Sequence, residues 1–140
     1  MYQIDFHKPL HIHFIGIGGI SMSGFAELLH DAGFTVKGSD ANRSKITEHL
    51  QSLGVEVLYG QKSNNITSDI DFVVYTAAIH PDNPEFRAAK EMGLPMMERA
   101  EMVGQVMKNY TNAIGVSGTH GKTTTTSMLT HIFLAAKKDP

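Results

Sequence analysis

The chain of 140 residues contains no cysteine. Disulfide bridges and thiolate metal sites are therefore excluded, and a reducing compartment is consistent with that absence. A chain of this length is large enough to bury the core of one ordinary domain without such cross-links. Hydrophobic residues at 41% and charged residues at 19% are typical of a globular protein.

The sequence also lacks a charge excess and a long apolar run. Its formal net charge is −2, so the surface has no basic excess and nucleic acid is not expected as a partner. No apolar run approaches the roughly 18–20 residues of a membrane span. The segment Met1–Pro9 has no signal-peptide apolar stretch. We therefore expect a cytoplasmic protein without membrane insertion.

What the sequence does contain is a regular alternation of short apolar runs and helical periods. Six strands are predicted, at residues 11–15, 34–38, 55–58, 71–75, 95–97 and 113–116. Ser44 and Asn83 are predicted helix caps, and Pro84 follows at a favoured first helical position. Short connections between strands and helices predict an α/β fold with a doubly wound, mostly parallel, Rossmann-like sheet and helices on both faces. Ligands of such folds bind outside the carboxyl ends of the strands.

The first strand is followed by a glycine-rich turn, Gly16–Ser21, here called the first turn. Its sequence, GIGGIS, approximates the pattern G-x-G-x-x-G, with Ser21 in place of the last glycine. Such glycines let a pyrophosphate approach backbone N–H groups, and Asp40 lies after the second strand, where an acidic residue meets ribose hydroxyls. The turn fits several nucleotide diphosphates, including NAD and FAD. A purely structural role for its glycines stays open at this point.

A second motif, Gly118–Thr124, is here called the phosphate cradle. Its sequence, GTHGKTT, follows an apolar run and precedes a helical pattern, although Val116 stands where the strict P-loop pattern has its first glycine. Backbone N–H groups and a helix N-terminus would face an anion, Lys122 would reach terminal phosphates, and the Thr123 hydroxyl would take a Mg²⁺ position. Four consecutive threonines are costly inside a helix, and a binding role would explain them.

Several other polar residues favour a structural interpretation. His11 and His13 share one face of a strand, but no third metal ligand is evident. Arg99 and Glu101 are typical of a solvated or salt-bridged helix start. His120 lies inside the phosphate cradle and near any nucleotide there, and both a loop-orienting and a chemical role stay open.

Two functions of other classes are compatible with one motif each. The first turn alone would suit a binding module that senses NAD(H). The phosphate cradle alone would suit a small free-standing P-loop NTPase. Each alternative leaves one of the two motifs without a role, which argues against both.

Taken together, the two motifs resemble the Mur ligases of peptidoglycan synthesis. The resemblance covers nearly the whole chain after residue 10, and the phosphate cradle is highly specific to that family. Within the family, the GIGG sequence of the first turn resembles the alanine-adding branch, whereas the murein tripeptide recycling branch looks like GICG there. The resemblance is carried by residues 13–24, 38–40, 77–79, 83–85, 99–101 and 118–126.

The resemblance implies an ATP-dependent, amide-forming ligase with UDP-N-acetylmuramate and L-alanine as substrates and ATP and Mg²⁺ as cofactors. It implies that residues 1–109 form a Rossmann-like domain that binds the UDP substrate. Residues 110–140 would then form the first strand, P-loop and helix of a truncated ATP-binding central domain. We expect no ligase turnover from these 140 residues alone, because the rest of that domain and the amino-acid pocket lie outside them.

The resemblance also implies a set of site residues. Lys122 is expected to neutralise phosphate charge during catalysis, and Thr123 to contact Mg²⁺. The residues expected to bind ATP are Gly118, Thr119, His120, Gly121, Lys122, Thr123 and Thr124. The residues expected to bind the UDP substrate are Gly16, Ile17, Gly18, Gly19, Ile20, Ser21, Met22, Ser39, Asp40, Thr76, Ala77 and Ala78.

Two residues depart from the family pattern. Ser21 replaces a common glycine, which changes little because serine is small. Gln61 follows Gly60 where many relatives have a histidine near the uracil, so the contact to the base stays open. The amino-acid specificity and the oligomeric state are also left open by the sequence.

Overall fold

The computed structural model describes residues 4–138 and divides the chain into two compact units that meet between Tyr110 and Thr111. The larger unit is built on one sheet of five strands in the order β3-β2-β1-β4-β5, and every pairing is parallel. The strands are β1 (His11–Ile15), β2 (Thr35–Asp40), β3 (Glu56–Tyr59), β4 (Phe72–Tyr75) and β5 (Met96–Glu98).

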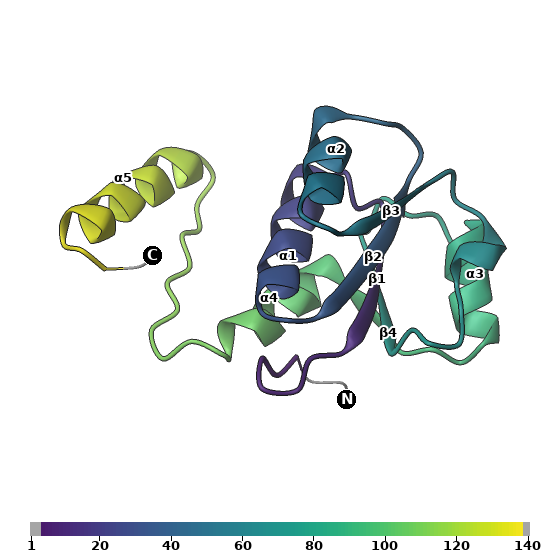
Figure 1. Cartoon of the computed structure of the whole chain (residues 1–140). Helices are drawn as coiled ribbons and strands as arrows, with labels where there is room; N and C mark the ends of the chain where they lie inside the picture. The colour runs from purple at the N-terminus through teal and green to yellow at the C-terminus, as the bar shows by residue number, and fades with distance from the viewer. Residues whose placement is uncertain (1–3, 139–140) are drawn as a thin grey trace. The chain divides into compact units, whose positions relative to one another are not determined.

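Helices cover both faces of this sheet, which confirms the predicted doubly wound α/β fold (Figure 1). The helices are α1 (Ile20–Asp31), α2 (Lys45–Ser52), α3 (Pro84–Glu91) and α4 (Arg99–Met107). On one face, Ile12 and Phe14 of β1 join a large apolar core with α1, α2 and α4. On the other, Ile15 and Val73 join a smaller core with α3. The strand order reverses between β1 and β4, and the carboxyl edge at that point is where ligands of such sheets bind.

Side-chain caps begin α2 and α3 at the predicted residues. The Ser44 hydroxyl accepts the backbone N–H of Thr47 at 3.2 Å, and the Thr47 hydroxyl accepts that of Ser44 at 2.9 Å. The Asn83 side-chain oxygen accepts the N–H groups of Glu85 and Phe86 at 2.9 and 3.2 Å, with Pro84 at the first helical position. These bonds satisfy N–H groups that a helix cannot pair internally.

The connection from β3 to β4 is polar and has no α-helix, only one 3₁₀ turn, η1 (Ser63–Asn65). Polar contacts hold the connection against the sheet. Lys37 of β2 is only 9% exposed; its ammonium donates to the Thr67 hydroxyl at 2.7 Å and lies 3.6 Å from the Asp69 carboxylate. The connection is therefore fixed by these polar contacts together with apolar packing, since Ile66 and Ile70 are buried in the smaller core.

The ends of the larger unit are joined by Asn109. The backbone N–H of Phe6 donates to the Asn109 side-chain oxygen at 3.0 Å, and the Asn109 amide donates to the carbonyl of Ile4 at 2.9 Å. The same amide donates to the carbonyls of Gln105 and Val106 at the end of α4. One side chain thus ties the start of the unit to its last helix.

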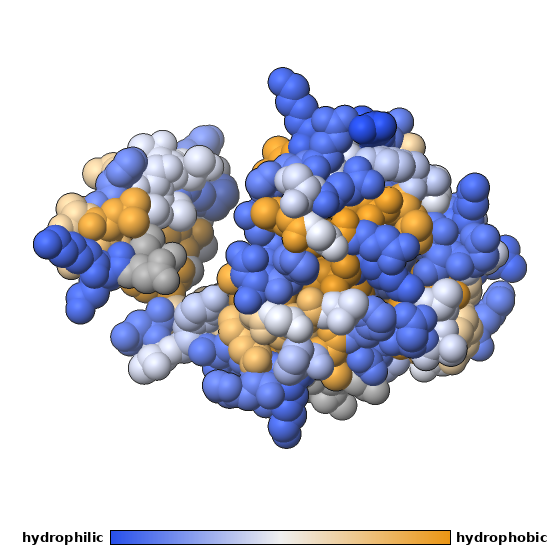
Figure 2. All heavy atoms as spheres, viewed as in Figure 1, coloured by the Kyte–Doolittle hydropathy of each residue, from blue (hydrophilic) through white to orange (hydrophobic). Residues whose placement is uncertain are grey.

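The smaller unit contains one regular element, α5 (Lys122–Ala135), among its described residues. The predicted sixth strand at residues 113–116 is wrong, because this segment has no regular secondary structure and pairs with no strand. A strand requires a neighbour, and the described part of this unit offers none. No residue of α5 is buried, and Met128, Ile132 and Leu134 are all more than half exposed. Apolar residues accordingly appear on the surface of this unit (Figure 2).

Candidate functional site

The first turn is held by the carbonyl group of Ser39, at the carboxyl end of the neighbouring strand β2. The backbone N–H groups of Gly16 and Ile17 donate to that carbonyl oxygen at 2.8 and 2.9 Å. The N–H of Gly19 donates back to the Gly16 carbonyl at 3.2 Å, which closes the turn before α1 begins. The turn is thereby fixed at the carboxyl edge of the sheet.

Asp40 fixes the next part of the same turn. One oxygen of its carboxylate accepts the N–H of Gly18 at 2.9 Å, and the other accepts the N–H of Asn42 at 3.1 Å. Residue 18 must be glycine for this approach, because a Cβ atom there would lie 2.7 Å from the Asp40 carboxylate oxygen. Asp40 therefore holds the turn in place, and its half-buried carboxylate stays at the edge where the ribose contact is predicted.

The N-terminus of α1 is open. Gly19 stands at the cap position and offers no side chain, and the first helical turn carries no acidic residue. Ile20 is 85% exposed and Ser21 is also exposed. Unpaired N–H groups and the positive end of a 12-residue helix dipole make such a terminus suitable for an anion.

The loop after β4 lies against the first turn. A Cβ atom added at Gly16 would stand 3.9 Å from the end of the Ile79 side chain. Ile79 closes a short turn, because its N–H donates to the Thr76 carbonyl at 2.9 Å. Ala77 and Ala78 within that turn are exposed. The structure therefore brings this loop, the first turn and Asp40 to one edge of the sheet.

Not every predicted residue of this edge has a free side chain. The side chains of Ile17, Met22 and Ser39 are buried, so these three residues can face a ligand only through their backbone. The oxygen of the Gln61 side chain accepts the Asn83 amide at 2.5 Å, which connects the loop after β3 to the start of α3. The predicted roles of all these residues in substrate binding stay predictions.

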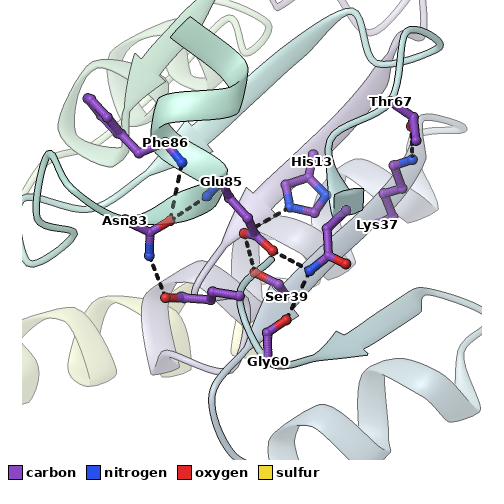
Figure 3. A network of polar contacts seen from close by, with 10 residues as sticks. His13, Lys37, Ser39, Gly60, Thr67, Asn83, Glu85 and Phe86 are labelled. Carbon is purple, nitrogen blue, oxygen red and sulfur yellow. Dashed lines mark hydrogen bonds and ion pairs between the residues drawn. The ribbon is translucent and has the colours of Figure 1, made fainter. Parts of the chain in front are cut away.

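Directly behind the edge lies a buried polar network that sequence reasoning missed. Glu85, at the N-terminal end of α3, is fully buried. Its side chain points toward His13 and Ser39 (Figure 3). One carboxylate oxygen accepts the Ser39 hydroxyl at 2.5 Å and lies 3.3 Å from His13 Nε2. The other accepts the Asn65 amide. His13 is also fully buried, and its Nδ1 has no partner in the described residues.

The network keeps Glu85 ionised despite its burial. Burial alone would raise the pKa of this carboxyl, because it disfavours the charged form. Hydrogen bonds from His13, Ser39 and Asn65 outweigh that effect, and the pKa is lowered from its ordinary value. Because a carboxylate only accepts hydrogen bonds, His13 donates to it through Nε2.

A signal for part of this network was present in the sequence. His13 stands in an apolar strand, and a buried polar side chain requires a partner. The identity of that partner depends on Glu85, 72 residues away, and a glutamate in the first turn of a capped helix normally faces solvent. No local pattern therefore indicates the pairing.

The phosphate cradle begins α5 as predicted. Gly121 stands at the cap position with φ of +76°, a left-handed conformation that favours glycine. The Lys122 ammonium donates to the Gly118 carbonyl at 2.7 Å, so it folds back over the loop. Thr119, His120, Thr123 and Thr124 are exposed, whereas the Thr126 hydroxyl donates to the Lys122 carbonyl. The cradle residues are therefore accessible to a ligand within this unit.

Residues 4–138 contain no cluster of three or more His, Asp or Glu side chains able to hold a metal ion. His11 and His13 have separate partners, since His11 lies 3.1 Å from Asp69 and His13 contacts Glu85. For Mg²⁺, the accessible Thr123 hydroxyl is an oxygen ligand of the required kind, beside a lysine that attracts phosphate. It supplies one position of six, so phosphate oxygens and water would provide the others. Over the same residues, no helix has the length and apolar character needed to cross a bilayer.

The fold defines a domain of the doubly wound α/β class, with a glycine-rich turn at the sheet edge where ligands of such folds bind. The family model described as "Mur ligase family, catalytic domain" matches residues 11–111 of the chain. The chain therefore belongs to the Mur ligase family, as the sequence motifs predicted.

Curated relatives of the chain are named UDP-N-acetylmuramate–L-alanine ligase. The relative from Agathobacter rectalis is 64% identical over the whole chain, and the one from Lachnoclostridium phytofermentans is 62% identical. The chain spans about 30% of the length of each.

Two solved structures of ligases are also similar. The UDP-N-acetylmuramate-alanine ligase MurC from Thermotoga maritima has a TM-score of 0.87 at 34% identity, with 94% of this chain and 30% of that chain covered. The UDP-N-acetylmuramate:L-alanyl-gamma-D-glutamyl-meso-diaminopimelate ligase from Neisseria meningitides has a TM-score of 0.83 at 33% identity. That match covers 92% of this chain and 40% of the other.

Proposed function

We propose that the chain is part of an ATP-dependent ligase that joins L-alanine to UDP-N-acetylmuramate in the cytoplasm. The observation that carries this proposal is the pair of nucleotide-type motifs, one in each unit, in a chain 64% identical to a ligase named for these two substrates. The match to the tripeptide ligase from Neisseria meningitides is weaker, at 33% identity, and the alanine-adding reaction is therefore favoured.

The two units take different parts of the reaction. Residues 1–109 bind the UDP portion, with the diphosphate against the N–H groups of residues 16–22 and the open terminus of α1. Asp40 and the loop 76–78 then lie around the ribose and the base. Residues 110–140 begin an ATP-binding domain, in which the phosphate cradle holds the triphosphate.

In the proposed reaction, the muramyl carboxylate attacks the γ-phosphate of ATP and ADP departs, which gives an acyl phosphate. The amine of L-alanine then attacks the acyl carbon and inorganic phosphate departs, which leaves an amide. Lys122 neutralises charge on the β- and γ-phosphates, and positioning and charge neutralisation supply most of the rate enhancement. Mg²⁺, held in part by Thr123, would supply further neutralisation of the phosphate oxygens.

Separate titrations with UDP-N-acetylmuramate, NADH and ATP-Mg test this proposal. We expect the 140-residue chain to bind the UDP substrate and to bind ATP weakly, since most of the ATP domain lies outside it. Tight NADH binding without a response to the UDP substrate would favour a dinucleotide-sensing module and refute the proposal. Alanine-dependent ADP release by the 140 residues alone would contradict the division of roles between the units.

A further inference from the structure

Glu85 is a buried charge for which the proposed reaction provides no chemical role. It lies fully buried at the N-terminal end of α3. It accepts hydrogen bonds from three other segments of the larger unit: β1, β2 and η1. Burying a carboxylate costs free energy even when it is well paired, so an apolar residue would serve packing alone at least as well. Packing alone therefore does not explain a carboxylate at this position, and the explanation lies in the groups that Glu85 holds in place.

The first of two hydrogen-bond paths runs through Ser39. The Ser39 hydroxyl donates to Glu85 Oε2 at 2.5 Å, which fixes the end of β2. The carbonyl of the same serine accepts the N–H groups of Gly16 and Ile17 at 2.8 and 2.9 Å. Glu85 is thus one residue removed from the start of the first turn.

The second path leaves from the other carboxylate oxygen. Glu85 Oε1 accepts the Asn65 amide, which also donates to the Gly60 carbonyl at 2.9 Å. The Gly60 N–H donates to the Asp40 carbonyl at 2.9 Å, and the Asp40 carboxylate accepts the Gly18 N–H at 2.9 Å. This path therefore ends at Gly18, the residue that follows Ile17 in the same first turn.

We propose that Glu85 is a positioning residue for the first turn, because its two carboxylate oxygens begin separate paths that converge on residues 16–18. It does not touch the ligand itself. The designation of the ligand group as a diphosphate rests on the proposed function, whereas the convergence of the paths does not.

A carboxylate is required because all three neighbours donate. Ser39, His13 and Asn65 each direct a hydrogen toward Glu85, and a carboxylate has acceptor sites for all of them. A glutamine has the same shape but presents N–H donors on one side. In Glu85→Gln the side-chain NH₂ group would therefore face a donor, and the hydrogen bond that begins at least one of the two paths would be lost.

Amide hydrogen exchange of the 140-residue chain tests the positioning directly. In Glu85→Gln we expect the exchange protection of the Gly16, Ile17 and Gly18 amides to fall by about tenfold or more relative to that of the Val55 amide. The Val55 amide is the reference because its N–H donates to the Leu50 carbonyl at the end of α2. The matched control is Glu91→Gln, an exposed glutamate on the same helix. Equal loss at all amides, or no loss at the first turn, would overturn the proposal.

Ligand binding gives a second measurement. Glu85→Gln should lower the affinity for UDP by about tenfold or more, as measured by calorimetry. It should lower the affinity for uridine by about twofold or less, as measured by NMR titration. An equal weakening of both ligands would indicate a merely structural role and overturn the proposal. A wild-type chain that does not bind UDP would instead refute the proposed function, and the exchange experiment would still decide the positioning role.

Single-path variants keep the proposal testable if Glu85→Gln does not fold. Ser39→Ala removes the hydroxyl of the first path and leaves the carbonyl, so Gly16 and Ile17 should lose protection while Gly18 keeps it. Asn65→Ala should give the opposite pattern. Unchanged protection of the first turn in both variants would overturn the proposal.

Discussion

At the scale of single residues, the first turn depends on close approach between backbone and carboxylate. Gly18 and Asp40 meet at 2.9 Å, and the space beside Gly18 is too small for a methyl group. The sequence alone indicated the glycines and the aspartate of this edge, because their types and spacing form a local pattern. It did not indicate that Glu85 is buried and paired, because the three donors that surround its carboxylate come from distant parts of the chain.

Gly18→Ala should therefore weaken UDP binding by about tenfold or more and lower the free energy of unfolding by about 1–3 kcal/mol. The added Cβ would stand 2.7 Å from Asp40 and 2.9 Å from a methyl group of Thr47. Calorimetry with UDP and urea denaturation would measure the two effects. Gly24→Ala is the control, because a Cβ there meets nothing within 4 Å and helix propensity should raise stability by about 0.5–1 kcal/mol. Wild-type UDP affinity in Gly18→Ala would contradict the prediction.

Glu85 should also make stability depend on pH in a defined direction. Its pKa is lowered in the folded state from an ordinary value of 4.5, so the native protein binds fewer protons than the unfolded chain between the two values. Its contribution is present above pH 4.5 and is lost as the pH falls through the folded pKa.

Urea denaturation at a series of pH values from 3 to 7 would measure this contribution. The gain in unfolding free energy on going from low to neutral pH should be smaller in Glu85→Gln than in the wild type, while Glu91→Gln should retain most of it. His13, the titratable group in contact with Glu85, is present in all three proteins. An identical pH dependence in Glu85→Gln and the wild type would refute the role of the ionised network in stability.

At the scale of elements, the locally encoded features were predictable and the pairing of strands was less so. The caps at Ser44 and Asn83 and the five strands of the sheet follow from residue type and periodicity. The predicted strand at 113–116 failed because an apolar run specifies extended backbone but not a neighbour to pair with. The β3–β4 connection shows the converse, since its polar sequence is fixed on the sheet by Lys37 and Glu85.

Asn83→Ala tests the cap of α3. It should lower the free energy of unfolding by about 0.5–2 kcal/mol, because the N–H groups of Glu85 and Phe86 lose their acceptor. Asn83→Ser retains a capping oxygen and should recover most of this loss, although it removes the contact to Gln61. Thermal or urea denaturation would compare the two. Equal destabilisation by both substitutions would assign the effect to the Gln61 contact and contradict the capping explanation.

At the scale of the whole molecule, the two units differ in how complete they are. The larger unit has its own sheet and two apolar cores, whereas α5 of the smaller unit has no buried residue. The UDP-binding role is therefore proposed for a part that has the packing needed to fold by itself. A chain that ends at Tyr110 should keep the thermal midpoint at which the larger unit unfolds. Its affinity for UDP should stay within about twofold of that of the 140-residue chain. Loss of UDP binding on this truncation would contradict that independence.

Lys122→Ala tests the other half of the division of roles, in the intact ligase. The substitution should abolish ADP release while the affinity for the UDP substrate stays unchanged, because Lys122 belongs to the phosphate cradle and not to the larger unit. Arg87→Ala, at an exposed position of α3 that pairs with Glu91, is a control expected to leave both quantities unchanged. Turnover at the wild-type rate in Lys122→Ala would overturn its assigned role.

The Asn109 contacts have a consequence for where the chain of the larger unit could be opened. Because the chain enters near Ile4 and leaves at Asn109, and one side chain binds both places, the two ends of the larger unit lie next to each other. A module with adjacent ends is readily inserted, fused or circularly permuted without disturbance of its sheet. New termini opened at the exposed Gly93, with the old ends rejoined beside Asn109, would retain every strand and helix of the unit.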